Sequence, residues 1–565
     1  MIKHFFLIGV MFVSAFSASA QSLATAYKTV GNANPISGSI FCADPTALDY
    51  EGRLYVYGSN DHQEFIANGK KGENSYGKIK SLVVFSTDDM VNWTFHGTID
   101  VGKLCSSWGW QFGNSWAPSV TWRSGKYRDE FFLYFANGAS NIGVLTASSP
   151  TGPWSSPKSG PMITGSTSGV SPCNWCFDPG VVIDENGQGW ISFGGGDPNG
   201  QGSDLQPNNA CIAKLKSTMT AIDGSAVKLP APYHFEASEL NIIGGKFVYT
   251  YCSSWKDRNA WSTYQQQQGI TVSTPGKCTM CYMVSDDPTE PSSWKYKGVY
   301  GPHASAPNNH SHLHKFNGKY YHIYHSADLL NSMKSKGGVD GSASTFRSIC
   351  VNAATVTEST PKINSVTLNQ SGVAAIKNFD PYVLQQAETM ATSGGVNYEN
   401  FKNLSANTDI SGLGNDASRN MTVKMAQGAW TVVRNVDFGT SGATSVTLRV
   451  KGKGTLEVRV GSRTSTSVAI VENTTTSLKT YTVDVDPTKC VGVKNLYFVS
   501  TGEHAIQFDQ WQFSDEVPDA INVPFIDASS DASSPKYYDF GGRQLKGMPA
   551  EGFFIDENGK KFWRK

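Results

Sequence analysis

The sequence predicts an all-β protein in which a five-bladed β-propeller is followed by a β-sandwich, or jelly-roll, domain. One hairpin-like pattern recurs five times in roughly the first 350 of the 565 residues, and alternating strands of a different texture follow it. The 56 glycines and 12% aromatic residues fit many short strands joined by turns, with flat surfaces for uncharged ligands such as sugars. The formal net charge is zero, which argues against a nucleic-acid partner.

A short apolar run opens the chain, preceded by Lys3 and followed by Ala18 and Ala20 at A-x-A spacing. This pattern predicts a secretory signal peptide over residues 1–20, cleaved after Ala20. A membrane anchor is the alternative, but the run is short and no later segment approaches the length of a spanning helix. We therefore expect a periplasmic or secreted protein without a membrane span.

Five segments within residues 28–375 share one template: a polar or aromatic residue, an apolar stretch, a turn with glycine, and a second aromatic strand. Each predicts a β-hairpin, and their starts lie roughly 60 to 75 residues apart. That spacing suits propeller blades with loop insertions, although periodicity alone leaves a sandwich open. The segments are "DPTALDYEGRLYVYGS" from Asp44, "WAPSVTWRSGKYRDEFFLYFA" from Trp116, "DPGVVIDENGQGWISFGG" from Asp178, "EASELNIIGGKFVYTYCS" from Glu236 and "NHSHLHKFNGKYYHIYHS" from Asn309.

Three of the five segments open with a carboxylate, namely Asp44, Asp178 and Glu236. Residues that open equivalent blades face one another at one end of the central channel of a propeller. Asp beside Pro and Glu also cap turns, which is the ordinary explanation for any one of them alone. Three carboxylates that converge on a cavity are costly, however, unless chemistry uses them. The repeat therefore predicts a catalytic site at the channel mouth.

Six motifs follow one another between residues 30 and 375: "ADPTALDYEGRLYVYGS", "WAPSVTW" with "GVLTASSPTGPW", "FDPGVVIDENGQGW", "FEASELNIIGGKFVYTYCS", "NNHSHLHKFNGKYYHIYH" and "FRSICV". Together they resemble glycoside hydrolase family 43. The resemblance implies an inverting, single-displacement hydrolase on a five-bladed propeller. In such a reaction one carboxylate deprotonates water, while a protonated carboxyl group roughly 6.5 to 9.5 Å away protonates the leaving oxygen.

Matched position by position, the resemblance gives the three carboxylates different roles. Asp44 is the expected general base, Glu236 the expected general acid, and Asp178 the third carboxylate, which orients the acid and raises its pKa. His310 matches a histidine beneath the family's active site, often beside a central metal ion or its waters; a hydrogen-bonded structural histidine is the alternative. Arg347 matches the pocket arginine, with a surface salt bridge as its alternative. We predict that His310 and Arg347 bind substrate.

Aromatic residues beside these positions are candidates for the walls of the sugar pocket. Trp116, Phe235 and Trp175 could pack against sugar C–H bonds, or could equally belong to the core. Of these, Trp116 and Phe235 are the predicted substrate contacts. Glu239, in "EASEL", stands where many family members have an aromatic residue, so it is expected to bear on the shape of the subsite.

Residues 381–515 change to alternating strands and glycine turns, which predict a β-sandwich. The segments "LQQAETMATSGGVNYENF", "GAWTVVRNVDFGTSGATSVTLRV" and "HAIQFDQWQF" resemble a family 6 carbohydrate-binding module. By that resemblance Gln386, Glu388 and Asp509 are candidate ligands of a structural calcium ion, which prefers oxygen donors. Ordinary surface polarity is the alternative for these three residues.

Tyr398 and Trp430 are possible sugar platforms in this module, although either could belong to its core. Leu478 stands where relatives often have a tryptophan, so the module could have become mainly structural. Residues 516–565 begin as a linker and end in a sequence that resembles C-terminal tails of exported proteins from some Gram-negative bacteria. A small β-hairpin is the alternative for that tail.

The resemblance to this catalytic family together with this module implies a hydrolase that removes α-L-arabinofuranosyl residues from arabinoxylan-type hemicellulose, and the N-terminal pattern predicts its export. A β-xylosidase acting on xylo-oligosaccharides is the alternative, because the two sugars present nearly the same hydroxyl arrangement to the same carboxylates. A non-catalytic glycan-binding protein is a further alternative, against which the three carboxylates argue. The expected partner is a plant cell-wall polysaccharide or oligosaccharide, the expected state is a monomer, and no organic cofactor is expected.

Two Cys-x-x-Cys pairs, Cys173 with Cys176 and Cys278 with Cys281, raise a competing hypothesis, a zinc protein. The pairs lie roughly 100 residues apart, far beyond the spacing of a zinc ribbon, although folding could join them. Export favours disulfides over zinc-bound thiolates. We expect Cys173 and Cys176 to brace or pack the loop that enters the third hairpin.

Overall fold

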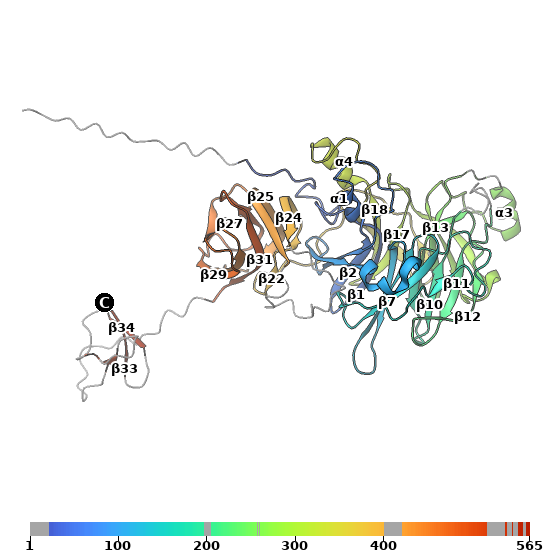
Figure 1. Ribbon diagram of the computed structural model, residues 1–565, viewed down its shortest axis with the longest axis horizontal. Helices are drawn as coiled ribbons and strands as arrows, with labels where there is room; N and C mark the ends of the chain where they lie inside the picture. The colour runs from blue at the N-terminus through green and yellow to red at the C-terminus, as the bar shows by residue number, and fades with distance from the viewer. Residues whose placement is uncertain are drawn as a thin grey trace, which may run out of the picture.

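The predicted all-β architecture is confirmed by the computed structural model, in which a five-bladed propeller precedes a nearly closed β-sheet domain (Figure 1). The predicted signal peptide lies outside the described residues. No helix in the described part of the chain is long and apolar enough to cross a membrane. The structure describes residues 22–196, 205–256, 258, 260–399, 421–516, 537–538, 545, 552–556 and 561–564.

Each blade is an antiparallel sheet of consecutive strands. The first contains β1 (Ala43–Tyr50), β2 (Arg53–Ser59), β3 (Leu82–Thr87) and β4 (Trp93–Ile99). The second contains β5 (Trp116–Arg123), β6 (Glu130–Asn137), β7 (Asn141–Ala147) and β8 (Ile163–Thr164). The third contains β9 (Gly180–Ile183), β10 (Gly189–Phe193), β11 (Cys211–Leu215) and β12 (Ile222–Lys228).

The fourth blade contains β13 (His234–Ile243), β14 (Lys246–Ser253), β15 (Met280–Ser285) and β16 (Lys295–Gly301). The fifth contains β17 (Ser311–Phe316), β18 (Lys319–Ser326) and β19 (Ser348–Ala354), followed by a short pair, β20 (Val356–Thr357) and β21 (Lys362–Ile363). The loops between strands carry α1 (Asp61–Ala67), α2 (Val101–Leu104), α3 (Trp261–Gln268) and α4 (Asp328–Ser335), with 3-10 turns at Ser106–Gln111 and Pro291–Ser293.

The first strands of the blades, β1, β5, β9, β13 and β17, contact one another in a closed ring around the channel. Neighbouring blades cover both faces of several strands, so β3, β10 and β15 are buried along their whole length rather than at alternate residues. In β3, "LVVFST", every residue is buried. The segment that enters β1 also bonds to the fifth blade: Ile36 N–H donates to Ile349 O (2.9 Å) and Cys42 N–H to Arg347 O (2.9 Å). These bonds join the last blade to the first.

Irregular backbone marks the mouth of the channel, where blades begin. Asp44, Ala117, Asp178 and Ala237 all have positive φ, between 38° and 61°. Strand pairing shifts register at three of these points, directly after Ala43, Trp116 and Glu236. Non-glycine residues in this region are strained, and such strain persists mainly where surrounding contacts hold it, often at functional sites. The carboxylates at the channel mouth thus lie at or next to β-bulges or strained residues, where the backbone departs from regular strand geometry and changes the direction of the side chains.

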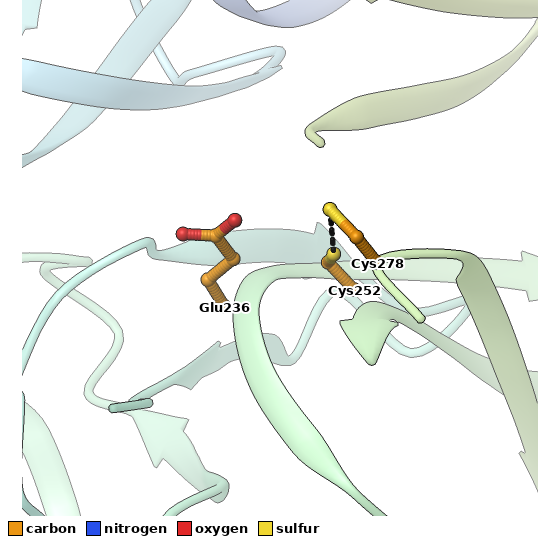
Figure 2. Close-up of side chains that lie close together, drawn as sticks. All are labelled: Glu236, Cys252 and Cys278. Atoms are coloured by element: carbon orange, nitrogen blue, oxygen red, sulfur yellow. Dashed lines mark hydrogen bonds between the residues drawn. The ribbon is translucent and has the colours of Figure 1, made fainter. Parts of the chain in front are cut away.

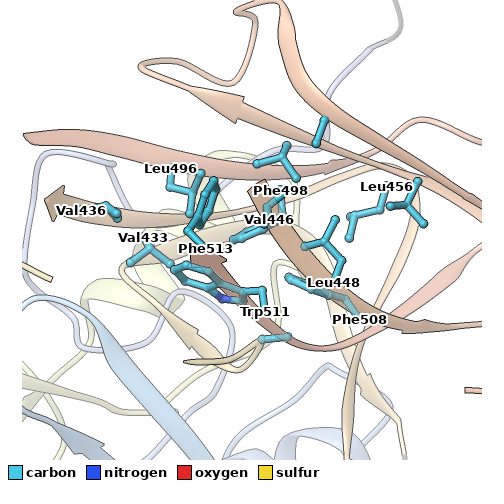
Figure 3. Close-up of a cluster of buried hydrophobic side chains, with 14 of the residues drawn as sticks. Val433, Val436, Val446, Leu448, Leu456, Leu496, Phe498, Phe508, Trp511 and Phe513 are labelled. Atoms are coloured by element: carbon cyan, nitrogen blue, oxygen red, sulfur yellow. The ribbon is translucent and has the colours of Figure 1, made fainter. Parts of the chain in front are cut away.

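The second domain is built around one long strand, β25 (Thr422–Asp437). Its beginning pairs with β31 (Ile506–Ser514) and its end with β30 (Val493–Ser500), so it joins both sides of the nearly closed sheet. Buried aromatic and aliphatic side chains, including Trp511, Phe513 and Phe498, fill the interior (Figure 3). The other strands are β22 (Gln385–Gln386), β24 (Thr392–Glu399), β26 (Ser445–Lys451), β27 (Gly454–Val460), β28 (Ser467–Asn473) and β29 (Lys479–Asp484).

The two domains are joined by hydrogen bonds as well as by packing. The short strand β23 (Thr389–Met390) pairs with β4 and so extends the first blade of the propeller. Asn92 donates its amide to Arg434 O (2.9 Å) and accepts from Arg434 N–H (2.8 Å). The ring of Tyr398 lies 4.8 Å from that of Phe95.

Trp430 cannot be the sugar platform that the sequence allowed, because it lies in this domain junction. Its side chain is fully buried, and its indole N–H donates to Ala24 O at 2.8 Å. Trp430 is therefore a core residue, which was the alternative that the sequence left open.

In the tail, β32 (Tyr537–Tyr538), β33 (Gly552–Asp556) and β34 (Lys561–Arg564) form a small antiparallel sheet that contains a hairpin.

Candidate active site

Asp44, Asp178 and Glu236 come together at the channel mouth, each with a relative exposure of 5–7%. His310 lies between two of them, with Nδ1 3.9 Å from Asp44 Oδ1 and 3.8 Å from Asp178 Oδ2. The backbone N–H of Ala237, the residue after Glu236, donates to Asp178 Oδ2 at 2.8 Å. The structure therefore assembles in one centre the three carboxylates and the histidine that the sequence singled out.

Close packing of the third and fourth blades makes this contact possible. Gly180, two residues after Asp178, lies against β13, and an added Cβ would meet the Ser238 carbonyl oxygen at 2.7 Å. Any larger residue would push β9 away from β13. The glycine thus sets the separation between Asp178 and Glu236, which sit at the starts of these two strands.

Asp44 is held in its charged form by a cation and hydrogen bonds. Arg347 Nη1 donates to Asp44 Oδ1 and the Ser59 hydroxyl donates to Oδ2, both at 2.7 Å. The backbone N–H of Asp44 donates to His325 Nδ1 at 3.1 Å. Burial alone would raise the pKa of Asp44, but the Arg347 guanidinium and nearby histidines hold that pKa well below its usual range. Asp44 is therefore an ionised acceptor at neutral pH.

Arg347 is itself fixed by a second carboxylate, Asp61, at the start of α1. Its Nε and Nη2 donate to the two oxygens of Asp61, both at 2.9 Å, in the bidentate geometry that guanidinium and carboxylate favour. The guanidinium carbon also lies 4.9 Å from the centre of the Tyr76 ring. Arg347 is only 3% exposed, so its alternative as a surface salt bridge is wrong.

Asp178 and Glu236 have the opposite electrostatic character from Asp44. Burial, outweighing the Ala237 hydrogen bond, raises the pKa of Asp178 to about 8. Burial and then the charge of Asp178 raise the pKa of Glu236 well above its usual range, although the Asn309 N–H approaches Glu236 Oε1 at 3.4 Å. Glu236 therefore holds its proton at neutral pH. One cleft contains a carboxylate without a proton and a carboxyl group with one, which is the arrangement general acid–base catalysis needs.

Partly exposed aromatic rings border this centre. The Trp116 indole N–H donates to Tyr76 O at 3.0 Å, and the rings of Trp116 and Tyr76 meet edge to face with centroids 6.5 Å apart. The Trp175 ring packs 5.6 Å from Phe235 and 5.3 Å from Phe177. Trp116 and Trp175 pack against one small buried cluster. These rings are positioned to present aromatic faces next to the carboxylates.

Glu239 does not shape a subsite, contrary to the expectation from the sequence. It is fully buried, and its Oε1 lies 3.1 Å from His312 Nδ1 beneath the carboxylates. Burial raises the pKa of Glu239 well above its usual range and lowers that of His312 to about 4. The two groups therefore meet as a neutral pair, with the Glu239 carboxyl group protonated and the His312 ring uncharged.

The sequence analysis missed four residues of this centre: Ser59, Asp61, Tyr76 and His325. Ser59 ends β2 and His325 lies near the end of β18, so both belong to second strands of blades. Asp61 and Tyr76 lie on the insertion between β2 and β3. A signal was present for Ser59 and His325, since each ends a matched motif, but nothing local marks Asp61 and Tyr76.

A metal ion bound directly by His310 is not supported by a group of ligands. Burial lowers the pKa of His310 to about 4, so the ring is neutral, and its Nδ1 faces two carboxylates. Among the described residues, one group of three His, Cys, Asp or Glu side chains has ligand atoms at metal-site spacing. That group does not include His310.

The three candidate calcium ligands lie close together in the second domain, at and next to the pairing of β22 with β31. Gln386 pairs with Gln510, and Ala387 N–H donates to Asp509 O at 2.9 Å. Glu388 is 3% and Asp509 9% exposed, so neither is the ordinary surface residue of the alternative explanation. Asp509 Oδ2 also lies 3.3 Å from Arg449 Nε. Buried oxygen donors of this kind fit a hard cation, with Arg449 supplying part of the compensating charge.

The cysteines do not pair as the Cys-x-x-Cys spacing suggested, and all ten are free thiols. Cys173 donates to Trp175 O and Asn209 O, at 3.0 and 3.2 Å, and its cysteine neighbour is Cys211. Cys176 packs in the core of the second and third blades. The pair at Cys173 and Cys176 thus packs the loop that leads to Asp178, while the structure does not unite it with Cys278 and Cys281.

Comparisons with known proteins agree with this geometry. The pattern for glycosyl hydrolases family 43 matches residues 32–329, and that for carbohydrate binding module (family 6) matches residues 386–515. The chain is similar to an arabinoxylan arabinofuranohydrolase from Paenibacillus polymyxa, at 35% identity over 86% of this chain and 75% of that protein. It is also similar to an arabinoxylan arabinofuranohydrolase from Bacillus subtilis (strain 168), at 33% identity over 89% of this chain and 96% of that protein.

A solved structure has the same two-domain architecture. It is a family 43 arabinoxylan arabinofuranohydrolase from Bacillus subtilis in complex with cellotetraose, with a TM-score of 0.75 and 32% identity. The match covers 87% of this chain and 99% of that one. The propeller and these matches define a glycoside hydrolase. The chain belongs to glycosyl hydrolases family 43 and carries a family 6 carbohydrate-binding module.

Replacing Asp61 by asparagine should destabilise the protein, because Arg347 would lose one of its two charged partners while it stays buried. We expect a loss of about 3 kcal/mol in the free energy of unfolding, measured by urea denaturation. Asp286→Asn is the matched control, since it removes an exposed partner of Lys246 and should cost about 0–1 kcal/mol. Equal effects of the two substitutions would contradict the central role of the Asp61–Arg347 pair.

Proposed function

We propose that the protein is an exported, inverting hydrolase that removes α-L-arabinofuranosyl residues from arabinoxylan-type hemicellulose. The observation that carries the proposal is the cleft that combines ionised Asp44 with protonated Glu236. Two relatives that share most of this chain are arabinoxylan arabinofuranohydrolases, which favours that substrate. The N-terminal pattern that ends at Ala20 supports export.

In the proposed reaction, water attacks the anomeric carbon in a single displacement. Asp44 accepts a proton from that water, and Arg347 and Ser59 keep Asp44 ionised and oriented before the substrate binds. Glu236 gives its proton to the glycosidic oxygen as the bond to the anomeric carbon breaks. The products are a sugar of inverted configuration and a free hydroxyl on the polysaccharide, after which Asp44 releases its proton to solvent and Glu236 regains one from solvent.

Asp178 contributes through its charge and its position rather than by transferring a proton. Its Oδ2 holds the backbone next to Glu236 through the Ala237 N–H, and above its pKa of about 8 its negative charge disfavours ionisation of Glu236. Trp116 and Phe235 would supply apolar faces for the furanose ring and the adjoining xylose. A β-xylosidase uses the same acid and base, so the difference between the two activities lies in the fit of the sugar ring.

Incubation with wheat arabinoxylan should release arabinose, and ¹H NMR should show the β-anomer as the first product. We expect Asp44→Ala to lower kcat/KM on arabinoxylan by about 10²–10⁴-fold. Glu236→Ala should lose much less activity on p-nitrophenyl arabinofuranoside than on arabinoxylan, because p-nitrophenolate leaves without a proton.

The same assays separate the alternatives. Release of xylose from xylo-oligosaccharides, without arabinose release, would favour the β-xylosidase. An α-anomer as first product would contradict inversion, and full activity of Asp44→Ala would exclude Asp44 as the base.

The pH profile should depend on Asp178. Glu236 acts only while protonated, so activity should fall as the pH rises through its raised pKa. Asp178 is ionised above its pKa of about 8, and there its charge adds to burial in raising the pKa of Glu236. Asp178→Asn removes that charge and should therefore move the alkaline limb of kcat/KM to lower pH. The exposed carboxylate of Asp340 provides the control, because Asp340→Asn should leave the limb in place. A limb that stays fixed, or moves to higher pH, in Asp178→Asn would contradict this role.

We further propose that the second domain binds the polysaccharide and that a calcium ion at Gln386, Glu388 and Asp509 stabilises it. Such an ion would supply positive charge for the buried carboxylates and fix the first strand of the domain to β31. Asp509 lies beside a register shift in the pairing of β26 with β31, which frees it from the regular ladder.

Removal of calcium should lower the melting temperature of the protein, and added calcium should restore it. At a calcium concentration 100 times the Kd the gain in stability is about 2.7 kcal/mol. Glu388→Gln should abolish this calcium-dependent shift. Glu457→Gln, which disturbs an ion pair with Arg459 on the same domain, should keep it. A shift equally large in both variants, or no bound calcium by elemental analysis, would contradict the site.

A further inference from the structure

Two thiols lie directly beside the carboxyl group of Glu236. Cys252 is near the end of β14 and Cys278 precedes β15, and their Sγ atoms are 3.6 Å apart (Figure 2). The Sγ atoms and a Glu236 oxygen all lie within 4.8 Å of one another. Glu236 is 5% exposed and the two cysteines 1% or less. This is the one group of three potential metal ligands found in the described part of the chain.

The spacing of the sulfurs is compatible with a metal site and too long for a disulfide. Zinc binds thiolates at about 2.3 Å in tetrahedral geometry, which places two sulfurs about 3.8 Å apart. A disulfide requires about 2.05 Å between them. The observed 3.6 Å is close to the first value and far from the second.

The same neighbour holds the carboxylate and the second thiol in place. Asn309 donates its side-chain amide to Cys278 O at 2.8 Å, and its backbone N–H approaches Glu236 Oε1 at 3.4 Å. Cys278 has a positive φ of 52°, and its N–H donates to Ser254 O at 3.2 Å. The three donors are therefore positioned by the fold, as the ligands of a rigid site are.

We propose that Glu236, Cys252 and Cys278 form a binding site for a thiophilic divalent cation, Zn²⁺ or Cd²⁺, and that its binding inhibits the hydrolase. The two thiols and the carboxyl group each give up a proton to solvent, and two thiolates and one carboxylate bind the ion. Three protein ligands leave a fourth position for water. Glu236 then has no proton to give to the glycosidic oxygen. The inhibition rests on the proposed role of Glu236 as the acid, whereas the binding does not.

Cadmium binding to the full chain tests the site without reference to activity. Titration of the reduced, chelator-treated protein with CdCl₂ should give one bound ion and the ultraviolet charge-transfer absorption of Cd²⁺–thiolate bonds. Release of arabinose from arabinoxylan, which needs the Glu236 proton, should fall with the same midpoint, and excess EDTA should restore it. Cys252→Ser and Cys278→Ser should each weaken cadmium binding at least about tenfold.

Cys173→Ser is the matched control, because Cys173 also has a cysteine neighbour, Cys211, but lies on another blade. Its cadmium affinity should equal that of the wild type. Each variant is compared with its own activity in chelator, so a change in basal rate does not affect the result. Absorption and affinity unchanged in both serine variants at Cys252 and Cys278 would overturn the proposal. So would a wild type that binds no cadmium, or one in which these thiols are found joined as a disulfide.

Binding with the predicted absorption but without inhibition would keep the metal site and remove Glu236 from the role of acid. The proposal of inhibition would then be wrong, while the family and the fold would be unaffected. Failure of the site and failure of the catalytic assignment are therefore distinguishable.

Discussion

The buried Arg347 guanidinium is the interaction on which the catalytic centre depends. It binds Asp61 with two nitrogens and Asp44 with the third, so one cation balances two carboxylates away from water. Because Arg347 precedes β19 whereas Asp44 and Asp61 belong to the first blade, the same contact also links the two ends of the ring. The charge state of the base and the closure of the propeller are thus determined by one side chain.

That cation also gives the carboxyl groups of the cleft two different protonation states. Asp44 lies in contact with it and is ionised. Asp178 and Glu236 lie beyond it, and burial, with added repulsion from neighbouring carboxylates, raises the pKa of each. No difference in residue type is needed for this, since Asp44 and Asp178 are both aspartates in Asp-Pro dipeptides on strained backbone. Position relative to Arg347 decides which of these carboxyl groups carries a proton.

The sequence predicted features that recur or that sit in motifs, and it missed features made by contacts between distant segments. Asp44, Asp178 and Glu236 were recognisable because each opens a repeat. Asp61 was not, since its partner Arg347 is 286 residues away. Trp430 was ambiguous for the same reason: its contact with Ala24 spans 406 residues. The Cys-x-x-Cys spacing likewise could not show that Cys278 lies beside Cys252, which is 26 residues away in the chain.

The pairing of β23 with β4 has a consequence for how the chain can be divided. Residues 389–390 fall within the part that matches the binding module, yet they form the outer strand of the first blade. A catalytic fragment cut at residue 375 would expose the outer edge of β4, with its unpaired N–H and C=O groups next to Trp93 and Phe95. Exposed edges of this kind recruit strands from other molecules. The smallest fragment that resists aggregation should therefore be defined by the sheet edge and not by the family boundary.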